Sequence, residues 1–453
     1  MDSRGKIKTL GLVYGNLTLG GIQKGASFQI PMFKAWGFRV IVLTNTPPCD
    51  QDYSVLGIDA RVCVGVYPFD PAKRADNIEK AVREYGIDLI VHHDAYTERE
   101  PKADIEGARR AGVPVVIFWH NVFSHFYLRK FRQLEAQGLF DACRGAAAMI
   151  TLTKTDEAFF RMLGVPALAI PYSDPDMMAG FVRRENPHRL VWMNRFIEQK
   201  RPVDAVRIFE KVLARHPDAE MYILGEAKEA RYAADPRPYV AERPALAKAV
   251  HFEGFQKDVR PYLEKCGVGL VTSRFEGYSH TIVEMKMASM PVVAYAMPYL
   301  DTLKPDSGAI CVPQEDVDAA ADAIIRLFDD PAEFRRQGEK ARESYFDIVS
   351  TDQETAYGRL FAAVESGGMD ELREIEPEYA HSVAETFVQH ADWALRLMDR
   401  TAREETDRAI REEWAHDRSY RLGRILTWPY RKLKRLLKND SARGHDAAMR
   451  IML

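Results

Sequence analysis

Two glutamates, Glu276 and Glu284, stand eight positions apart in the segment of this chain best suited to chemistry. Glu276 follows the apolar run Val268–Val271, which predicts a buried parallel strand, and Glu284 lies in a pattern typical of a helix. On one continuous helix, eight positions would turn the two side chains about 80° apart. The carboxylates therefore converge better if Glu276 lies in a strand-end loop and Glu284 on the helix that follows.

The backbone between the two glutamates predicts a site for an anion. Ser279, His280 and Thr281 would open the expected helix. The N–H groups of a first helical turn have no partner within the helix and carry its positive dipole end, so they bind phosphate well. Two carboxylates for sugar or ribose hydroxyls beside a phosphate site suit a nucleotide-sugar.

The same segment resembles the signature of the retaining glycosyltransferases of family 4, which have the two-domain GT-B fold. That signature is Glu-Gly-Phe-Gly, with a second Glu eight positions after the first, then a helix of small residues and Pro-Val-Val. The chain departs from it at Tyr278, Ser279 and Ser289, where the family commonly has Phe, Gly and Gly; these changes concern pocket shape and helix packing. The positions that it keeps are Glu276, Gly277, Glu284, Pro291, Val292 and Val293.

Two cations upstream fit the same resemblance. Arg195 follows the expected strand Leu190–Asn194, and Lys200 precedes a proline suited to the first turn of a helix. A departing diphosphate needs compensating positive charge at such a strand end. The resemblance gives that role to Arg195 and Lys200, a donor-sugar contact to Glu276 and a ribose contact to Glu284. The alternative for the two cations is a solvated loop.

Histidines end two strands of the first half. His120 follows Pro114–Trp119, and the resemblance implies that it contacts the donor sugar near the reacting carbon; the alternative is a strand-end histidine bonded to backbone. His92, His93 and Asp94 end a neighbouring strand and would line the acceptor side. No third ligand spacing beside them indicates a metal.

Other short motifs carry weaker signals. By resemblance, Gly20 and Gly21 face the donor phosphate, although a plain tight turn explains them nearly as well. Gly254 and Phe255 match the region that holds the nucleobase, and they do not distinguish uracil from guanine or adenine. Asp174–Asp176 has the Asp-x-Asp pattern of metal-dependent transferases but lies in the expected linker, so we expect no obligatory metal and no cofactor.

Strand patterns alternate with helical patterns in two series and predict an α/β fold with two doubly wound parallel sheets. By resemblance these are two Rossmann-like domains facing across a cleft, with strand carboxyl ends on its walls. The expected divisions are an acceptor-side domain at 1–175, a nucleotide-sugar domain at 188–350, a crossover helix at 351–366 and an appended helical region at 367–453.

Bulk composition describes an ordinary soluble chain of 453 residues, with 46% hydrophobic and 28% charged residues. A net charge of -3 gives no argument for nucleic-acid binding, and five scattered cysteines predict reduced thiols in a cytoplasmic protein without a signal peptide. The segment Arg418–Lys438 holds no acidic residue and alternates basic and aromatic residues with Leu and Ile. It predicts either a peripheral contact with an anionic membrane on its inner face or a helix packed on the protein's own acidic surface.

The resemblance, together with these features, implies a retaining hexosyltransferase that moves a sugar from a nucleotide-sugar, expected to be a UDP-sugar, to a hydroxyl acceptor. A cell-envelope or capsular glycan or a lipid-linked intermediate is the expected acceptor. A GT-B nucleotide-sugar epimerase and a catalytically inactive transferase-like partner subunit are the alternatives. The sequence leaves the donor sugar, the base, the linkage and the oligomeric state open.

Overall fold

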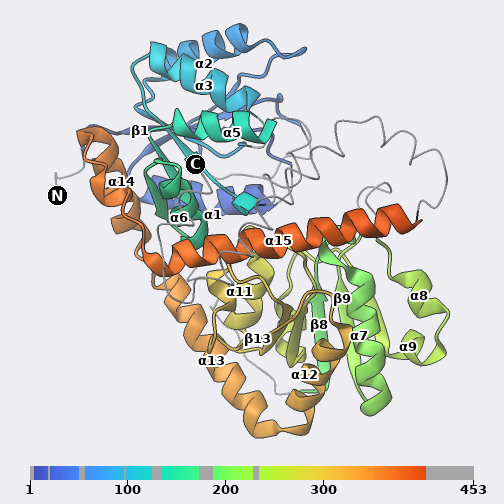
Figure 1. The fold of residues 1–453 in the computed structure, drawn as a ribbon. Helices are drawn as coiled ribbons and strands as arrows, with labels where there is room; N and C mark the ends of the chain where they lie inside the picture. The colour runs from blue at the N-terminus through green and yellow to red at the C-terminus, as the bar shows by residue number, and fades with distance from the viewer. Residues whose placement is uncertain are drawn as a thin grey trace. The chain divides into compact units, whose positions relative to one another are not determined.

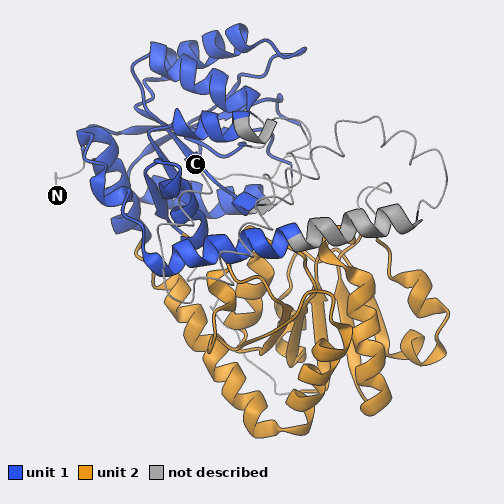
Figure 2. Cartoon of the chain, in the orientation of Figure 1, with its two compact units in different colours: residues 1–170, 353–453 blue, residues 171–352 orange. Residues whose placement is uncertain are grey.

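The computed structural model describes residues 5–18, 21–49, 57–95, 98–124, 135–172, 187–227 and 234–404. The chain divides into two compact units (Figures 1 and 2). The first unit combines residues 1–170 with 353–453, and the second comprises residues 171–352.

The first unit is built on a seven-stranded sheet in the order β3-β2-β1-β4-β5-β6-β7, and its neighbouring described strands pair in parallel. The strands are β1 (Thr9–Tyr14), β2 (Arg39–Thr44), β3 (Ala60–Cys63), β4 (Leu89–His92), β5 (Val115–Phe118), β6 (Ala148–Thr151) and β7 (Ala167–Ala169). The helices are α1 (Gly21–Ala35), α2 (Pro71–Tyr85), α3 (Arg99–Arg110), α5 (Glu135–Arg144), α6 (Lys154–Met162), α14 (Gln353–Ser366), η6 (Asp370–Leu372) and α15 (Pro377–Glu404).

The second unit is built on a six-stranded sheet in the order β10-β9-β8-β11-β12-β13. Its neighbouring described strands also pair in parallel. The strands are β8 (Arg189–Met193), β9 (Glu220–Leu224), β10 (Val250–Gly254), β11 (Val268–Val271), β12 (Val292–Tyr295) and β13 (Ala309–Val312). The helices are η3 (Glu198–Lys200), α7 (Pro202–Arg215), α8 (Arg237–Ala241), α9 (Pro244–Ala249), α10 (Arg260–Lys265), α11 (His280–Met287), η5 (Asp301–Leu303), α12 (Val317–Asp329) and α13 (Pro331–Val349).

Both sheets reverse their strand order at one place, between β1 and β4 in the first unit and between β8 and β11 in the second. In an open parallel sheet, ligands bind beyond the strand carboxyl ends at such a switch point, because the connecting helices leave the sheet on opposite faces there. The strands around each reversal are almost entirely buried, which explains their continuous apolar sequences. The α/β architecture predicted from the sequence is confirmed.

The sequence did not predict β3, the edge strand Ala60–Cys63. Its residues are partly to fully exposed, and it pairs on one side with β2. A short edge strand needs no continuous apolar run, so its pattern gives little signal.

The helix expected to cross back to the first domain is α14, which packs within the first unit. The Tyr357 hydroxyl accepts a hydrogen bond of 2.7 Å from Gln29 Nε2 of α1, and its ring meets Phe33 edge-on at 5.0 Å between centroids. In the helical region that follows, Ser124 Oγ and His390 Nδ1 of α15 lie 2.5 Å apart. Through these contacts, α14 and α15 pack against the rest of the first unit.

The predicted basic segment, residues 418–438, lies outside the described residues. Among the helices that the structure describes, none is both long and apolar enough to cross a membrane.

Replacing Tyr357 tests how α14 is held. Tyr357→Ala should lower the free energy of unfolding by about 3–5 kcal/mol, because a buried aromatic side chain leaves a cavity. Tyr357→Phe should lower it by about 1–3 kcal/mol, since Gln29 loses its buried acceptor. Urea denaturation measures both. The exposed Tyr67→Phe is the matched control and should change it by less than about 0.5 kcal/mol. A Tyr357→Phe protein as stable as the wild type would show that the hydrogen bond contributes nothing.

Candidate active site

A buried ion pair joins the carboxyl ends of β8 and β11. Lys200 Nζ lies 2.6 Å from each carboxylate oxygen of Glu276, and the two side chains are 10% and 7% exposed. Ser273 Oγ donates to Glu276 Oε1 at 2.6 Å, and the Glu276 backbone N–H donates to the Tyr299 hydroxyl at 2.9 Å. These contacts fix both the carboxylate and the loop that carries it.

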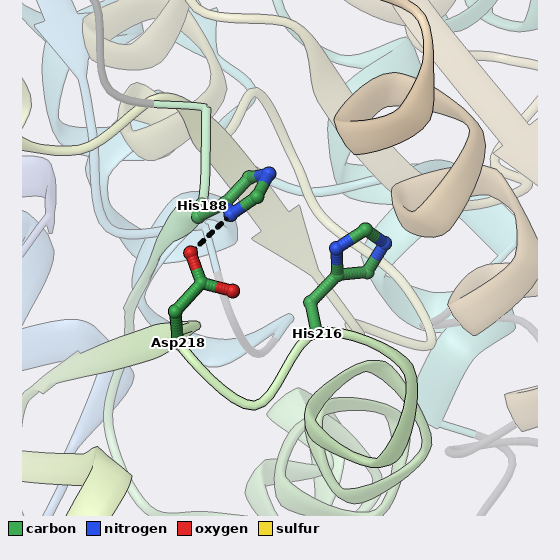
Figure 3. A group of neighbouring side chains, drawn as sticks. All are labelled: His188, His216 and Asp218. Carbon is green, nitrogen blue, oxygen red and sulfur yellow. Dashed lines mark hydrogen bonds and ion pairs between the residues drawn. The ribbon is translucent and has the colours of Figure 1, made fainter.

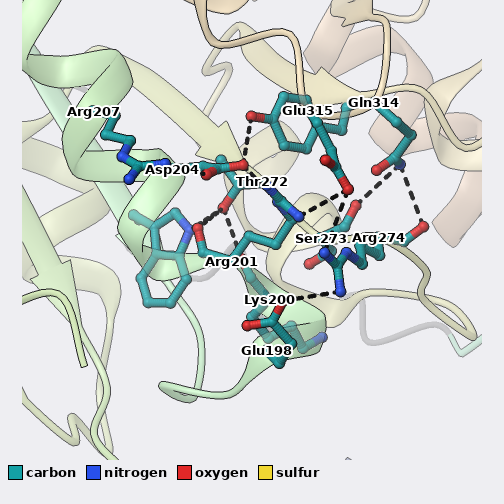
Figure 4. Close-up of polar contacts among 12 residues, drawn as sticks. Glu198, Lys200, Arg201, Asp204, Arg207, Thr272, Ser273, Arg274, Gln314 and Glu315 are labelled. Carbon is teal, nitrogen blue, oxygen red and sulfur yellow. Dashed lines mark hydrogen bonds and ion pairs between the residues drawn. The ribbon is translucent and has the colours of Figure 1, made fainter. Parts of the chain in front are cut away.

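A second set of charged groups connects the two loops (Figure 4). Arg201 Nη1 lies 2.9 Å from Glu315 Oε1, and Arg274 Nη2 lies 3.4 Å from the same oxygen. Arg201 directly follows Lys200, and Arg274 lies two residues before Glu276. One carboxylate therefore holds together the backbone neighbours of both members of the ion pair.

Thr272 ties the same loops through uncharged contacts. Its hydroxyl donates to the Lys200 carbonyl at 2.7 Å and accepts from the buried indole N–H of Trp192 at 2.9 Å. Because Trp192 lies in β8 and Thr272 follows β11, this chain of bonds spans the switch point. The position of Lys200 is thus set by the two central strands of the sheet.

Helix α11 begins beside this pair. Ser279, its N-cap residue, has a left-handed backbone (φ 63°), makes no side-chain cap, and the first turn carries no acidic residue. Thr281 Oγ1 donates to the Met193 carbonyl at the end of β8 at 3.1 Å. Glu284 lies further along the helix and is 6% exposed. A helix start without an acidic group suits a phosphate, and phosphate binding at this helix start stays a prediction.

The structure places Arg195 in the loop after β8 with an exposed side chain. The contacts described above for Lys200 and Glu276 do not include it. The backbone beside it is tightly constrained, because a Cβ on Gly225, at the end of β9, would lie 1.9 Å from the Asn194 carbonyl oxygen. Only glycine fits there, and its φ of 135° also favours glycine.

The expected nucleobase region lies at the next strand end. Gly254 ends β10 with φ 68°, and its carbonyl accepts a 2.7 Å hydrogen bond from the Gly225 N–H. Phe255 follows with 53% of its surface exposed. The ends of β8, β9 and β10 therefore follow one another along this edge.

In the first unit, two histidines meet at the carboxyl ends of β4 and β5. His93 Nδ1 and His120 Nε2 lie 3.0 Å apart. The His93 ring stacks on Tyr14 at 4.4 Å, and the His120 ring stacks on Phe118 at 4.5 Å. Burial lowers the pKa of His93 well below its ordinary value, so we expect the His93 imidazole to be neutral. One hydrogen bond between the two rings then holds His120 in place.

Asp94 stands beside the histidines, at the switch point of the first sheet. Burial raises the pKa of its carboxyl group to about 6. Asn45 Nδ2 donates to Asp94 Oδ2 at 3.4 Å, and a Cβ on Gly15 would come within 2.3 Å of that oxygen. A half-buried carboxyl group that titrates near neutral pH is typical of sites that exchange protons or bind hydroxyls.

Behind Asp94, a fully buried charged group joins β4 to the helices α2 and α3. Arg74 binds both oxygens of Asp104 at 2.6 and 2.8 Å, and His92 Nε2 lies 3.0 Å from Asp104 Oδ2. His92 therefore points away from His93 and serves the packing of the unit. The expectation that all three of His92, His93 and Asp94 line one site does not hold for His92.

The predicted positions Gly20 and Asp174–Asp176 lie outside the described residues. Gly21 is described and is the first residue of α1. The central pair is also supported by three residues that the sequence patterns did not predict, Ser273, Tyr299 and Glu315. Ser273 was visible as a hydroxyl three residues before Glu276. Tyr299 and Glu315 follow β12 and β13, and only their place after buried strands could have indicated them.

Residues 187–330 match the family model described as Glycosyl transferases group 1. This match supports a group 1 glycosyltransferase, and it covers the part of the chain that holds the Lys200–Glu276 pair.

Curated relatives match part of the chain. An exopolysaccharide phosphotransferase of Streptomyces coelicolor is 26% identical over 276 residues, or 58% of this chain and 28% of that protein. A poly(ribitol-phosphate) alpha-N-acetylglucosaminyltransferase of Staphylococcus aureus is 23% identical over 162 residues, or 35% of this chain and 32% of that protein. The chain thus spans about a third or less of the length of these relatives.

A solved structure extends the likeness to most of the chain. HepE of Anabaena in complex with UDP has a TM-score of 0.61 at 16% identity, over 79% of this chain and 100% of that one. At this identity the likeness concerns the fold. It confirms the predicted GT-B class, with two Rossmann-like sheets and an added C-terminal helical region.

Replacing Asp94 tests its burial. The folded-state pKa lies above the unfolded value of 3.8, so the ionised carboxylate opposes folding above pH 6, and this cost disappears as the pH falls toward 4. Asp94→Asn should therefore raise the free energy of unfolding at pH 8 by up to about 3 kcal/mol, and the gain should shrink steadily by pH 5. Urea denaturation at several pH values measures this. The exposed Asp76→Asn is the control; a gain independent of pH would contradict the assignment.

Proposed function

We propose that the chain is a retaining glycosyltransferase of the family 4 type. It transfers a sugar from a nucleotide-sugar, a UDP-sugar, to a hydroxyl group of an envelope or capsular glycan or of a lipid-linked intermediate. The observation that carries the proposal is the buried Lys200–Glu276 pair at the switch point, beside the uncapped start of α11.

Binding of the donor would exchange partners at this pair. Without a donor, Lys200 and Glu276 neutralise each other at 2.6 Å. The diphosphate of a donor takes the Lys200 ammonium and the N–H groups at the start of α11, and Arg195 adds a second cation from the solvent side. Glu276 is then released to accept hydrogen bonds from sugar hydroxyls, while Glu284 accepts hydrogen bonds from the ribose. Each charge that loses a partner gains another, so little desolvation cost remains uncompensated.

The reaction proposed for this arrangement breaks the bond between the anomeric carbon and the diphosphate oxygen. The acceptor oxygen bonds to the anomeric carbon on the same face, and its proton passes to a phosphate oxygen of the leaving group. Lys200 and Arg195 stabilise the negative charge that grows on the diphosphate. The products are a glycoside with retained configuration and a nucleoside diphosphate, and no metal or covalent sugar–enzyme intermediate enters.

The comparisons support parts of this proposal. UDP is bound in the solved structure of HepE, and the Staphylococcus aureus relative is named as an alpha-N-acetylglucosaminyltransferase that acts on poly(ribitol-phosphate). In the first unit, His120 and Asp94 offer a neutral imidazole and a titrating carboxyl group, which suit hydroxyl contacts. A location on the inner face of the membrane, through Arg418–Lys438, stays a prediction from the sequence.

Lys200→Ala should lower kcat/KM for nucleotide-sugar turnover by at least about 100-fold, because the leaving group loses its buried cation. Glu284→Ala should weaken turnover as well. Lys211→Ala is the matched control: it removes a lysine of α7 whose partner is the exposed Asp318, and it should leave turnover unchanged. The assay incubates each protein with UDP-, GDP- and ADP-sugars and a panel of glycan acceptors, and NMR of the product reads its anomeric configuration.

Unchanged turnover in Lys200→Ala would contradict the assignment of Lys200 to the active site. An inverted product would overturn the retaining mechanism, and an isomerised donor formed without acceptor would identify an epimerase. Binding of donors without any turnover would favour the inactive partner subunit.

A further inference from the structure

A group of metal-ligand side chains lies at the opposite edge of the second sheet. His188 directly precedes β8, His216 follows α7, and Asp218 lies two residues before β9 (Figure 3). One potential ligand atom from each residue lies within 4.8 Å of the other two. We propose that His188, His216 and Asp218 bind one divalent cation, Zn²⁺ or a neighbouring first-row metal ion.

The backbone holds these three positions together before any ion arrives. The Glu220 N–H donates to the His188 carbonyl at 3.0 Å, where β9 pairs with the start of β8. The His216 N–H closes the end of α7 on the Val212 carbonyl at 2.8 Å, and the Ala219 N–H closes the next turn on the His216 carbonyl at 3.0 Å. The ligands are therefore brought together by the sheet register and by a tight turn, so binding orders few additional residues.

The separations are close to those of a tetrahedral site. Zinc bonds of about 2.0–2.2 Å to nitrogen and oxygen place neighbouring ligand atoms about 3.3 Å apart. His188 Nδ1 and Asp218 Oδ2 now share a hydrogen bond of 2.6 Å, so they need to part by less than about 1 Å. His216 has to approach by about 1.5 Å at most. The Asp218 side chain is 67% exposed and free to rotate that far, and the site is open to solvent on its side.

The surroundings of His216 match those of a metal-binding imidazole. Its Nε2 lies 3.3 Å from Asp329 Oδ1, and Figure 3 shows its other ring nitrogen on the side of His188 and Asp218. Histidine ligands of metals commonly donate their second N–H to a carboxylate. The buried Nε2 of His216 makes no hydrogen bond here, and Asp329 lies at ion-pair distance from it as a carboxylate of that kind. Phe328 packs against both imidazoles, with ring centroids 4.7 Å from His188 and 5.2 Å from His216.

The ligand types select the ion. Two imidazoles and one carboxylate suit zinc and its first-row neighbours, whereas Mg²⁺ and Ca²⁺ require mostly oxygen ligands. A water molecule would complete the four-coordinate set.

The expected role of this ion is structural. β8 has five residues, so at about 3.3 Å per residue the proposed ion lies roughly 15 Å from the loop that carries Lys200. It would bridge the start of β8 to the turn between α7 and β9, with Asp329 at the end of α12 as a positioning residue. We therefore expect the ion to change stability and not turnover.

Isothermal titration of the chelator-treated full chain with ZnCl₂ tests the proposal, with MgCl₂ in parallel. We expect one equivalent of zinc to bind and to raise the melting temperature, and magnesium to do neither. Asp218→Asn and His216→Ala should abolish the zinc effect, and Asp329→Asn should weaken zinc binding by about 10- to 100-fold. His381→Gln, which removes an exposed histidine of the first unit, is the matched control and should bind zinc like the wild type.

Asp218→Asn changes an exposed side chain and should fold normally, so it keeps the test decisive if His216→Ala is unstable. Absence of zinc binding in the wild type, or equal binding in Asp218→Asn and the wild type, would overturn the proposal. The visible spectrum of bound cobalt(II) adds an independent check. Bands of a tetrahedral nitrogen–oxygen site support the assignment, and thiolate charge-transfer bands would assign the ion to cysteines instead.

Discussion

The ammonium–carboxylate pair of Lys200 and Glu276 is the interaction on which the second unit's binding edge depends. Burying two charges is favourable only when each is fully compensated, and removing one partner of such a pair typically costs about 3–5 kcal/mol. The structure meets this requirement with Ser273 and Tyr299 on the carboxylate and its loop, and with Thr272 on the lysine's backbone. The two charges are thus held in a fixed arrangement, and the proposed function has a ligand of matching polarity separate them.

The strand order explains why these residues meet although they are 76 positions apart. Lys200 follows β8 and Glu276 follows β11, and these strands are neighbours only because the order reverses between them. The reversal of strand order in the first sheet likewise brings Gly15, which follows β1, against Asp94, which follows β4. In both units the polar residues occupy the carboxyl ends of the strands. The histidine–aspartate group at the amino ends of β8 and β9 is separate from this chemistry.

The sequence predicts the elements and the strand-end residues because buried parallel strands are continuous apolar runs, and Glu276, Glu284 and Lys200 follow or adjoin such runs. It does not predict Tyr299 or Glu315, whose contacts depend on how distant loops fold together. The sequence also does not predict the backbone conformation of Ser279 and Ser289. Both adopt left-handed conformations, at φ 63° and 54°, that favour glycine. These are two positions at which the signature that the sequence resembles commonly has Gly, and a left-handed backbone is one that glycine adopts readily.

The binding of UDP to a Glu276→Gln protein, measured by calorimetry against the wild type, tests whether a diphosphate takes Lys200 from Glu276. UDP carries the diphosphate but no sugar, so in this account Glu276 only competes with it for Lys200. Glu276→Gln should therefore bind UDP more tightly than the wild type does. Weaker binding of UDP by Glu276→Gln would contradict the exchange of partners at Lys200 and the nucleotide-sugar site built on it.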